Sequence, residues 1–436
     1  MNCKLFSSLC VAGLASGAFA AATLPTINPN SVTITQNIRN RVVVEYTLAG
    51  TNAIVTAEAY TNGVAIAASS FTALTGDVNC RVAPGARAFQ WKPADDFHGR
   101  PLENLTIRLT AHAMQRPPDY MVVDLSTLKD DKHPVRYYTS TNALPGGFAN
   151  DKYKTTHLVV RRIPAAGVTW TAGQTSADSW QNPHWCTPRL VTLTQDYWIG
   201  VYEVTQKQYD YFSGVARHAV WRSAADADMR PTENISFQQL RGAVWQKSYE
   251  WPASGHDVDP ASPLGVLRAR TDIEFDLPTD AQWEYACRAG TTTPLNSGKW
   301  CGLDGNLTYE EGNEVGWHKH NSEIDGVRQT HAVGLKRPNA WGLYDMHGNV
   351  LELCLDRKQS STATDADFYL SADWEIDPVG ATNLALGNRV ARGGSYDFVE
   401  RQMFSGDRSN HCAWSWPSAD GKSGFDRGFR LCAPLE

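Results

Sequence analysis

The sequence changes character near residues 139–147, and this change limits the fold more than any other feature. Before it, short β-branched runs alternate with turn signals, and residues 105–110 alternate apolar and polar side chains as one half-buried strand would. After it, tryptophan and glycine become frequent, and helices are predicted for the first time. Because 436 residues exceed what one core usually holds, we expect two domains joined by this small, polar, glycine-rich segment.

The first twenty residues are typical of an export signal. Lys4 precedes an apolar run, and Ala18-Phe19-Ala20 has the small residues of a cleavage site. The alternative, an ordinary N-terminal helix, is disfavoured by the switch to Pro25, Pro29 and strand-like sequence. We therefore expect a signal peptide at 1–20 and a protein exported to the periplasm, the cell surface or the extracellular space.

The two predicted domains differ in secondary structure. Residues 21–155 are expected to form an all-β sandwich of immunoglobulin-like size, and residues 156–436 an irregular α+β domain. In the latter, Thr205 and Gln208 have capping-box spacing at the start of one helix, and Thr279 is placed to cap another. Long glycine-punctuated stretches separate these two helices.

Composition excludes several classes of protein. The chain is 42% apolar and 20% charged, which is globular rather than disordered composition. Forty basic and 46 acidic residues give a net charge of −6, so a nucleic-acid partner is not expected. No apolar stretch of membrane-spanning length follows the N-terminal segment, so we expect no transmembrane segment in the mature chain.

A series of motifs in the second domain carries a family resemblance. In order, they are Arg162-Ile163-Pro164-Ala165 and residues 197–205, 277–286, 338–350, 392–396 and 428–431. Over about residues 160–436 the chain resembles the formylglycine-generating enzyme, or sulfatase-modifying factor, family. The resemblance implies a variant of the C-type lectin fold, with a small antiparallel sheet, two helices and extensive loops.

The resemblance also implies an activity, which two positions of this chain contradict. The family oxidises a sulfatase cysteine to formylglycine with O2 and a copper(I) ion held by two cysteine thiolates, which are suitable ligands for this soft ion. The corresponding positions here are Phe398 and Met403. One thioether cannot replace two anionic sulfurs, so we expect neither copper nor formylglycine-generating activity.

One histidine cluster could serve another metal. Some relatives use non-heme iron, but their iron histidines lie in an added helical bundle, and this chain has a β-domain instead. His318-Lys319-His320, with His331 nearby, is the cluster worth weighing. On a strand both rings would lie on one face and suit a metal, whereas solvated histidines on a polar loop are the commoner and favoured interpretation.

Calcium is the cofactor that the resemblance favours. It implies a site built from the side chains of Asp345 and Glu352 and the backbone carbonyls of Gly348 and Val350. Oxygen ligands from a tight loop suit this hard cation. The alternative is that Asp345 caps a turn and Glu352 is solvated. Asp325 and Val327 resemble half of a second family site.

Tyr396 and the loop after it form the predicted ligand-binding surface. In the family it lines the substrate groove, and in related variable proteins it contacts the ligand. Mixed aromatic and polar residues on a scaffolded loop are typical of recognition sites, although each aromatic alone could simply cover core. The candidates are Tyr396, Phe398, Glu400, Gln402, Asp407, Arg408, Trp414 and Trp416.

The resemblance further implies a disulfide between Cys287 and Cys432. Leu431 is a one-residue departure from the family pattern here, and a one-residue slip on a strand turns a side chain to the opposite face. Two separate buried thiols are the alternative. The pairing of Cys80, Cys186, Cys301, Cys354 and Cys412 stays open.

Three functions are compatible with these features. The favoured one is an exported, copper-free family member that binds a protein or glycan ligand, with the β-domain as a spacer or a second contact. The second is an oxidoreductase, or another protein- or metabolite-modifying enzyme of the family, that uses a different metal. The third is a structural protein of the cell envelope.

Overall fold

The computed structural model describes most of the chain outside its N-terminal segment. The described residues are 24–37, 40–96, 102–173, 188–214, 219–242, 257–299, 310–358, 374–379, 388–408, 411–413 and 425–435. The predicted signal peptide, Trp414 and Trp416 lie outside them. Strands predominate in the described ranges, where no helix is both long and apolar enough to cross a lipid bilayer.

The N-terminal unit consists of two antiparallel sheets with one core between them. Alternate side chains of β3, including Val44, Tyr46 and Leu48, are buried in this core together with Trp91 and Phe71. The first sheet contains β1 (Thr26–Ile27), β2 (Thr33–Gln36), β3 (Val42–Ala49), β6 (Leu74–Gly76) and β8 (Gly85–Trp91), and the second contains β4 (Ala53–Thr61), β5 (Val64–Ala65), β7 (Cys80–Val82) and β9 (Thr106–Ala113). The short helix α1 (Pro93–Asp96) follows β8.

A five-stranded antiparallel sheet organises the second unit. Its order is β11 (Val135–Tyr138), β10 (Tyr120–Asp124), β12 (His157–Ile163), β15 (Tyr197–Gly200) and β25 (Cys432–Pro434). β10 and β11 therefore belong to this sheet, and the boundary predicted at residue 155 separates strands that pair. The physical reason is that β10 is buried on both faces, with Val122 in one core cluster and Met121 and Val123 in another.

The segment predicted as a linker packs against the second unit. Leu144 is fully buried there, and the Phe148 ring stacks on Tyr202 with centroids 5.9 Å apart. The small, polar composition of this segment predicted a linker between domains. Instead, a few apolar side chains anchor the segment to the second unit.

Both predicted helices are confirmed. Thr205 caps α3 (Gln206–Ser213) and Thr279 caps α6 (Asp280–Arg288), each in a complete capping box. The sequence prediction missed α2 (Lys152–Thr155), α4 (Phe237–Arg241), α5 (Pro263–Thr271) and α7 (Glu310–Val315). Local signals for two of these exist, since Ser236 makes a capping box with Gln239 and Ser262 caps α5, which begins with a proline.

The second unit also contains smaller sheets, which position the loops of the candidate site. β20 (Leu351–Lys358) lies between β22 (Asn388–Arg392) and β24 (Arg427–Gly428), with β23 (His411–Ala413) outside β22. β13 (Val168–Ala172), β14 (Arg189–Leu193) and β21 (Trp374–Ile376) form another sheet, while β16 (Gly316–Trp317) pairs with β19 (His347–Gly348) and β17 (Glu323–Ile324) with β18 (Val327–Arg328).

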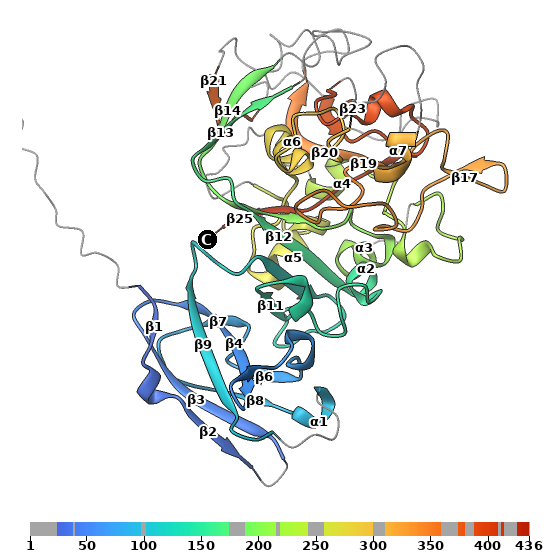
Figure 1. Ribbon diagram of the computed structural model, residues 1–436. Coiled ribbons are helices and arrows are strands. Elements are labelled where there is room, and N and C mark those ends of the chain that lie inside the picture. Colours follow the sequence, from blue (N-terminus) through green and yellow to red (C-terminus); the bar gives the residue numbers. More distant parts are fainter. Residues whose placement is uncertain are drawn as a thin grey trace, which may run out of the picture.

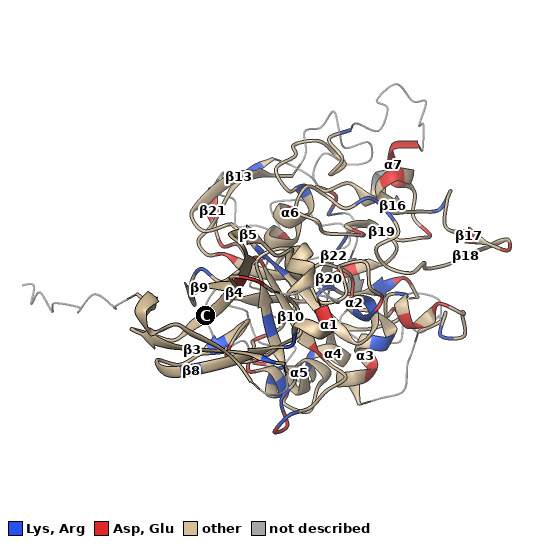
Figure 2. Ribbon diagram, turned by 60° about the horizontal axis from the view of Figure 1, so that its bottom comes forward, with Lys and Arg blue, Asp and Glu red and all other residues tan. Residues whose placement is uncertain are grey.

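The two units lie at opposite ends of the molecule. Figure 1 shows the blue strands of the N-terminal unit at one end and α6 and α7 at the other. Figure 2 shows basic and acidic residues interspersed over the described elements, in keeping with the small net charge. An acidic first turn of α7, formed by Glu310 and Glu311, is the clearest local departure.

Candidate functional site

The loop that carries the predicted ligand-binding residues begins at two glycines after β22. Gly393 and Gly394 both have positive φ, at 89° and 71°. A Cβ on Gly394 would lie 2.9 Å from the carbonyl oxygen of Gln402, closer than real Cβ contacts. Glycine is therefore required where the chain turns back on the short 3-10 helix η8 (Glu400–Met403).

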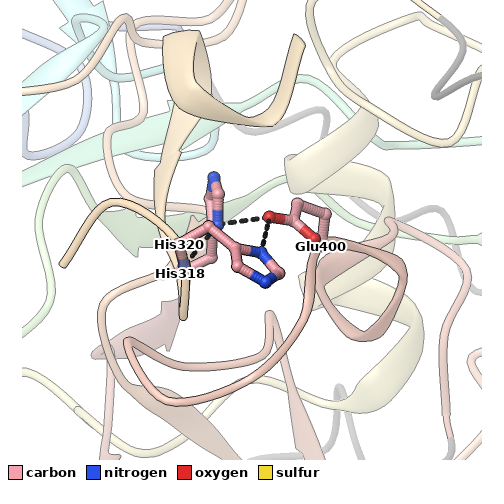
Figure 3. A group of neighbouring side chains, drawn as sticks. All are labelled: His318, His320 and Glu400. Carbon is pink, nitrogen blue, oxygen red and sulfur yellow. Dashed lines mark hydrogen bonds and ion pairs between the residues drawn. The ribbon is translucent and has the colours of Figure 1, made fainter. Parts of the chain in front are cut away.

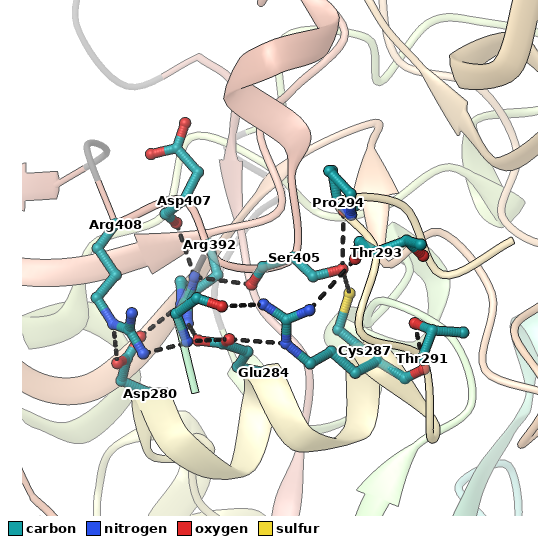
Figure 4. A network of polar contacts seen from close by, with 12 residues as sticks. Asp280, Glu284, Cys287, Thr291, Thr293, Pro294, Arg392, Ser405, Asp407 and Arg408 are labelled. Atoms are coloured by element: carbon teal, nitrogen blue, oxygen red, sulfur yellow. Dashed lines mark hydrogen bonds and ion pairs between the residues drawn. The ribbon is translucent and has the colours of Figure 1, made fainter. Parts of the chain in front are cut away.

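Buried ion pairs fix the far end of this loop to α6 (Figure 4). The carboxylate of Glu284 accepts hydrogen bonds from Arg288, Arg392 and Arg408 at 2.5–2.8 Å, and Arg408 also pairs with Asp280 at 2.7 Å. Burial alone would raise the pKa of Glu284, but the guanidinium groups of Arg408, Arg288 and Arg392 outweigh it and lower this pKa to about 2. The carboxylate stays ionised and holds the loop.

Apolar side chains occupy the two positions, 398 and 403, that the resemblance matches to copper-binding cysteines. Met403 is fully buried, and its carbonyl oxygen lies 2.6 Å from Nδ1 of His347. Phe398 is half-buried and packs against a core cluster. The pair offers one thioether and no thiolate, so these residues do not fit a copper(I) ion.

The predicted ligand-binding residues separate into two groups. Tyr396, Glu400 and Arg408 are buried, with at most 7% of each residue exposed, so they support the loop from inside rather than contact a ligand. For Arg408 the reason is its pairing with Asp280 and Glu284. The half-buried residues that can reach solvent are Phe398, Gln402 and Asp407.

The histidine cluster assembles around Glu400 rather than around His331. Nδ1 of His318 lies 2.5 Å from Oε1 of Glu400, and Nδ1 of His320 lies 2.7 Å from the same oxygen (Figure 3). His331 points elsewhere, because its Nε2 lies 3.0 Å from the carbonyl oxygen of Ser322 and its ring stacks on Trp317. The sequence identified both histidines, whereas Glu400 was assigned to ligand binding.

A close approach of two short strands positions these histidines. A Cβ on Gly316 would lie 2.1 Å from the carbonyl oxygen of His347, so glycine is required where β16 pairs with β19. The chain then turns, and Asn321 Oδ1 accepts a hydrogen bond from the backbone N–H of His318 at 2.7 Å. His318 and His320 are thus brought to one point by a turn, and the strand considered for this segment ends at Trp317.

Of the residues predicted to bind calcium, Glu352 is paired with a buried arginine. Arg430 donates to both carboxylate oxygens of Glu352, at 2.7–3.1 Å, and Trp283 Nε1 donates to Glu352 Oε2 at 2.7 Å. Glu352 therefore has no need of a metal ion to balance its charge. Asp345 differs, since its Oδ2 accepts from Gly334 N at 2.6 Å while its buried Oδ1 has no partner among the described residues.

A third carboxylate in this cluster was missed from the sequence. Glu203 is buried and accepts hydrogen bonds from Asn349 Nδ2 and Val350 N. Burial and the neighbouring charge of Asp345 raise the pKa of Glu203, and burial raises the pKa of Asp345 to about 6. A charged residue inside the apolar run Ile199–Thr205 was the available signal. Asp325 and Val327 lie on the exposed β17–β18 hairpin.

The predicted disulfide is wrong, since Cys287 and Cys432 are both free. Cys432 Sγ lies 3.7 Å from Oε1 of Gln282 in the first turn of α6, whereas Cys287, five residues further along the helix, contacts Ser405 Oγ at 3.5 Å. Five residues correspond to a rise of about 7.5 Å, so the two thiols face different levels of one core. Burial raises the pKa of Cys287 to about 12.

Comparison with known proteins identifies the family. The profile of the sulfatase-modifying factor enzyme 1-like domain matches residues 154–434. The formylglycine-generating enzyme of Thermomonospora curvata is 31% identical over an alignment of 182 residues, and the alignment covers 36% of this chain and 51% of the enzyme. Chaperone protein LppX of Paenibacillus barcinonensis is 29% identical over an alignment of 193 residues, which covers 38% of this chain and 63% of that protein. The chain thus spans between half and two thirds of these relatives.

The solved structures that match this chain are only loosely similar to it. Treponema denticola variable protein 1 has 23% identity and a TM-score of 0.42, covering 64% of this chain and 96% of its own. PvdO from Pseudomonas aeruginosa has 20% identity and a TM-score of 0.43, covering 64% and 94%. Because the family profile extends over well over half of the sequence, the chain belongs to the formylglycine-generating enzyme, or sulfatase-modifying factor, family.

Proposed function

We propose that this protein is an exported, ligand-binding member of its family that lacks copper-dependent formylglycine-generating activity. The observation that carries the proposal is the pair Phe398 and Met403 at the thiolate positions, because it removes the copper ligands and leaves the loop in place. We favour a protein ligand over a glycan, since one relative bears the name of a chaperone protein.

The anchoring of the described part of the loop, residues 393–408, supports recognition. This part is held by the glycine turn after β22 and by the buried pairs of Arg408 with Asp280 and Glu284. A loop held in this way loses little conformational entropy when a ligand binds. Exposed and half-buried side chains of different chemistry line it, including Asp397, which pairs with Arg328 at 2.5 Å, and the ring of Phe398.

The N-terminal unit is proposed as an immunoglobulin-like sandwich that serves as a spacer or second contact. A cavity of about 560 Å³ lies where this unit meets the second one, and its lining includes Tyr60, Ile66, Phe71 and Tyr138. Polar side chains, among them Glu58 and His112, complete this lining, and a cavity of this size with mixed lining is typical of binding pockets. Calcium, proposed near Asp345, would stabilise the second unit and has no part in recognition.

An alternative enzyme function is favoured by one observation only. His318, His320 and Glu400 converge next to Phe398, so a different metal could lie close to the position of the family's copper. The binding function remains preferred because the half-buried loop residues need no metal to contact a ligand.

Binding can be tested with two variants of equal size change. The double variant Phe398→Ala/Gln402→Ala alters the proposed contact surface, and Trp374→Ala alters an exposed ring on β21. Wild-type protein is cross-linked to extracytoplasmic proteins and, separately, applied to a glycan array. We expect a saturable protein partner that the Trp374 variant retains and the double variant loses. Retention by all three proteins would overturn the proposal, whereas glycan binding with the same variant pattern would exchange the ligand class.

A further inference from the structure

Three side chains from two distant segments converge at the loop that follows β22, whose described residues 393–408 we call the recognition loop. We propose that His318, His320 and Glu400 form a binding site for one divalent transition-metal ion. The site is separate from the thiolate positions of the family, since none of its ligands is at 398 or 403. It also goes beyond the proposed binding function, which requires no metal.

The ligand atoms already point toward one another. Nδ1 of both histidines and one carboxylate oxygen of Glu400 all lie within 4.8 Å of one another. Figure 3 shows a nitrogen of each ring directed at the same carboxylate oxygen of Glu400. A metal bound at about 2.0–2.2 Å to each ligand needs N···O separations of roughly 3–3.5 Å, so the present N···O separations of 2.5 and 2.7 Å would have to widen by about 0.5–1 Å.

Unsatisfied buried atoms provide a second, independent observation. Glu400 is 2% exposed, yet its Oε2 has no hydrogen-bond partner among the described residues. His318 is fully buried, and its Nε2 also lacks a partner there. Buried polar atoms are normally satisfied, so a carboxylate with one oxygen to spare indicates a missing positive partner.

The space around the site fits the required change of proton position. In the ion-free form Nδ1 of His320 can donate its proton to Glu400, while Nδ1 of His318 also accepts from the backbone N–H of His320 at 3.3 Å. A metal at Nδ1 leaves the proton of each neutral ring on Nε2 or releases it. Nε2 of His318 faces Gly312 of α7, where even a Cβ would lie 3.4 Å away. Glycine at this position leaves room for an N–H on the far side of the ring.

The ligand set selects the class of metal. Two borderline imidazoles with one hard carboxylate suit zinc or iron(II), whereas calcium takes six to eight oxygens, of which this set supplies at most two. His320 is the exposed member, with 35% of its side chain accessible, so water or a small ligand can complete the coordination from that side. Such an open position distinguishes this arrangement from a closed structural zinc site.

A backbone hydrogen bond links the proposed site to the recognition loop. Lys319 N, between the two histidines, donates to the carbonyl oxygen of Phe398 at 2.9 Å. Glu400 follows two residues after Phe398 and opens η8. A metal ion there would join the histidine turn to the loop and stiffen both.

The test uses the untagged full chain, stripped with a chelator and titrated with zinc(II), and with cobalt(II) as a coloured probe. We expect one ion per chain, with visible cobalt bands typical of nitrogen and oxygen ligands. His320→Ala removes the accessible ligand without opening the core, and it should weaken zinc binding at least tenfold. Glu400→Gln keeps the shape and should have a similar effect.

His331→Gln is the matched control, because this histidine is close in sequence but points away from the cluster. It should bind zinc like the wild type. Absence of saturable binding at micromolar zinc, or equal affinity in the His320 and wild-type proteins, would overturn the proposal. Because the metal alone is the probe, either result leaves the test of ligand binding untouched.

Discussion

Lys319 and Phe398 are joined by a backbone hydrogen bond of 2.9 Å, and this bond connects two segments that no local pattern relates. On one side lies the turn with His318 and His320, and on the other the loop whose family counterpart holds copper. The same loop is fixed to α6 through Arg408. Contacts between distant segments therefore hold this loop at both Phe398 and Arg408.

The first prediction is that the protein makes no formylglycine. With copper(I), O2 and a Cys-x-Pro-x-Arg peptide, the peptide mass should stay unchanged, because Phe398 and Met403 offer no thiolate to the ion. The formylglycine-generating enzyme of Thermomonospora curvata, assayed alongside, serves as the positive control. A peptide mass that shifts to the aldehyde with this protein would contradict the prediction.

The second prediction separates Glu352 from Asp345. Glu352→Gln should lower the free energy of unfolding by about 3–5 kcal/mol whether or not calcium is present, since it leaves Arg430 buried without its anionic partner. Asp345→Asn should remove any calcium-dependent rise in melting temperature, because a ligand of the folded state stabilises by mass action.

Thermal melts of the two variants and the wild type, with calcium and with chelator, check this prediction. A calcium effect that survives in Asp345→Asn would exclude that residue as a ligand. An effect of Glu352→Gln that appears only with calcium would restore Glu352 as a calcium ligand.

Local signals predicted local structure well. The capping box at Thr205 and the cap at Thr279 located both helices, because a cap and its helix lie within four residues of each other. The boundary between the units was harder. β10 pairs with β12, which lies more than thirty residues later in the sequence. The sequence of residues 120–124 does not indicate whether this partner strand belongs to the first or the second unit.

Only part of the candidate site could be predicted from the sequence, because the rest of it also depends on contacts between distant segments. His318 and His320 were visible as a pair, whereas Glu400 lies 80 residues away and joins them only through the fold. Arginine is usually found on the surface, so nothing in the sequence indicated that Arg408 would lie in the interior. It is buried because it pairs with Asp280 and Glu284 on α6. Charge pairing across such distances leaves no periodic trace in a sequence.

The third prediction concerns the ion pairs that hold the loop. Arg408→Met should lower the free energy of unfolding by about 3 kcal/mol, because Glu284 and Asp280 would lose one of the guanidinium groups that neutralise them in the interior. Chemical denaturation of the variant and the wild type measures the difference.

Arg337→Met is the control for this third prediction. Arg337 also pairs with a carboxylate, that of Glu314, but 59% of its side chain is exposed, so the loss should stay below about 1 kcal/mol. Equal losses in the two variants would show that burial of the Arg408 pairs adds nothing to stability.

The last prediction is a pH dependence of stability caused by Glu233. This residue is buried next to Tyr396 and Asp426, and burial raises its pKa to about 7 from an ordinary value near 4.5. Between these values the folded protein holds a proton that the unfolded chain has released, so stability falls as pH rises from 4.5 to 7, by roughly 3 kcal/mol in all.

Glu233→Gln cannot titrate, so its free energy of unfolding should change less with pH over this window than that of the wild type. Glu323→Gln, at an exposed carboxylate on β17, should follow the wild-type curve. Urea titrations at several pH values supply the measurement, and parallel curves for wild type and Glu233→Gln would show that Glu233 is ionised throughout.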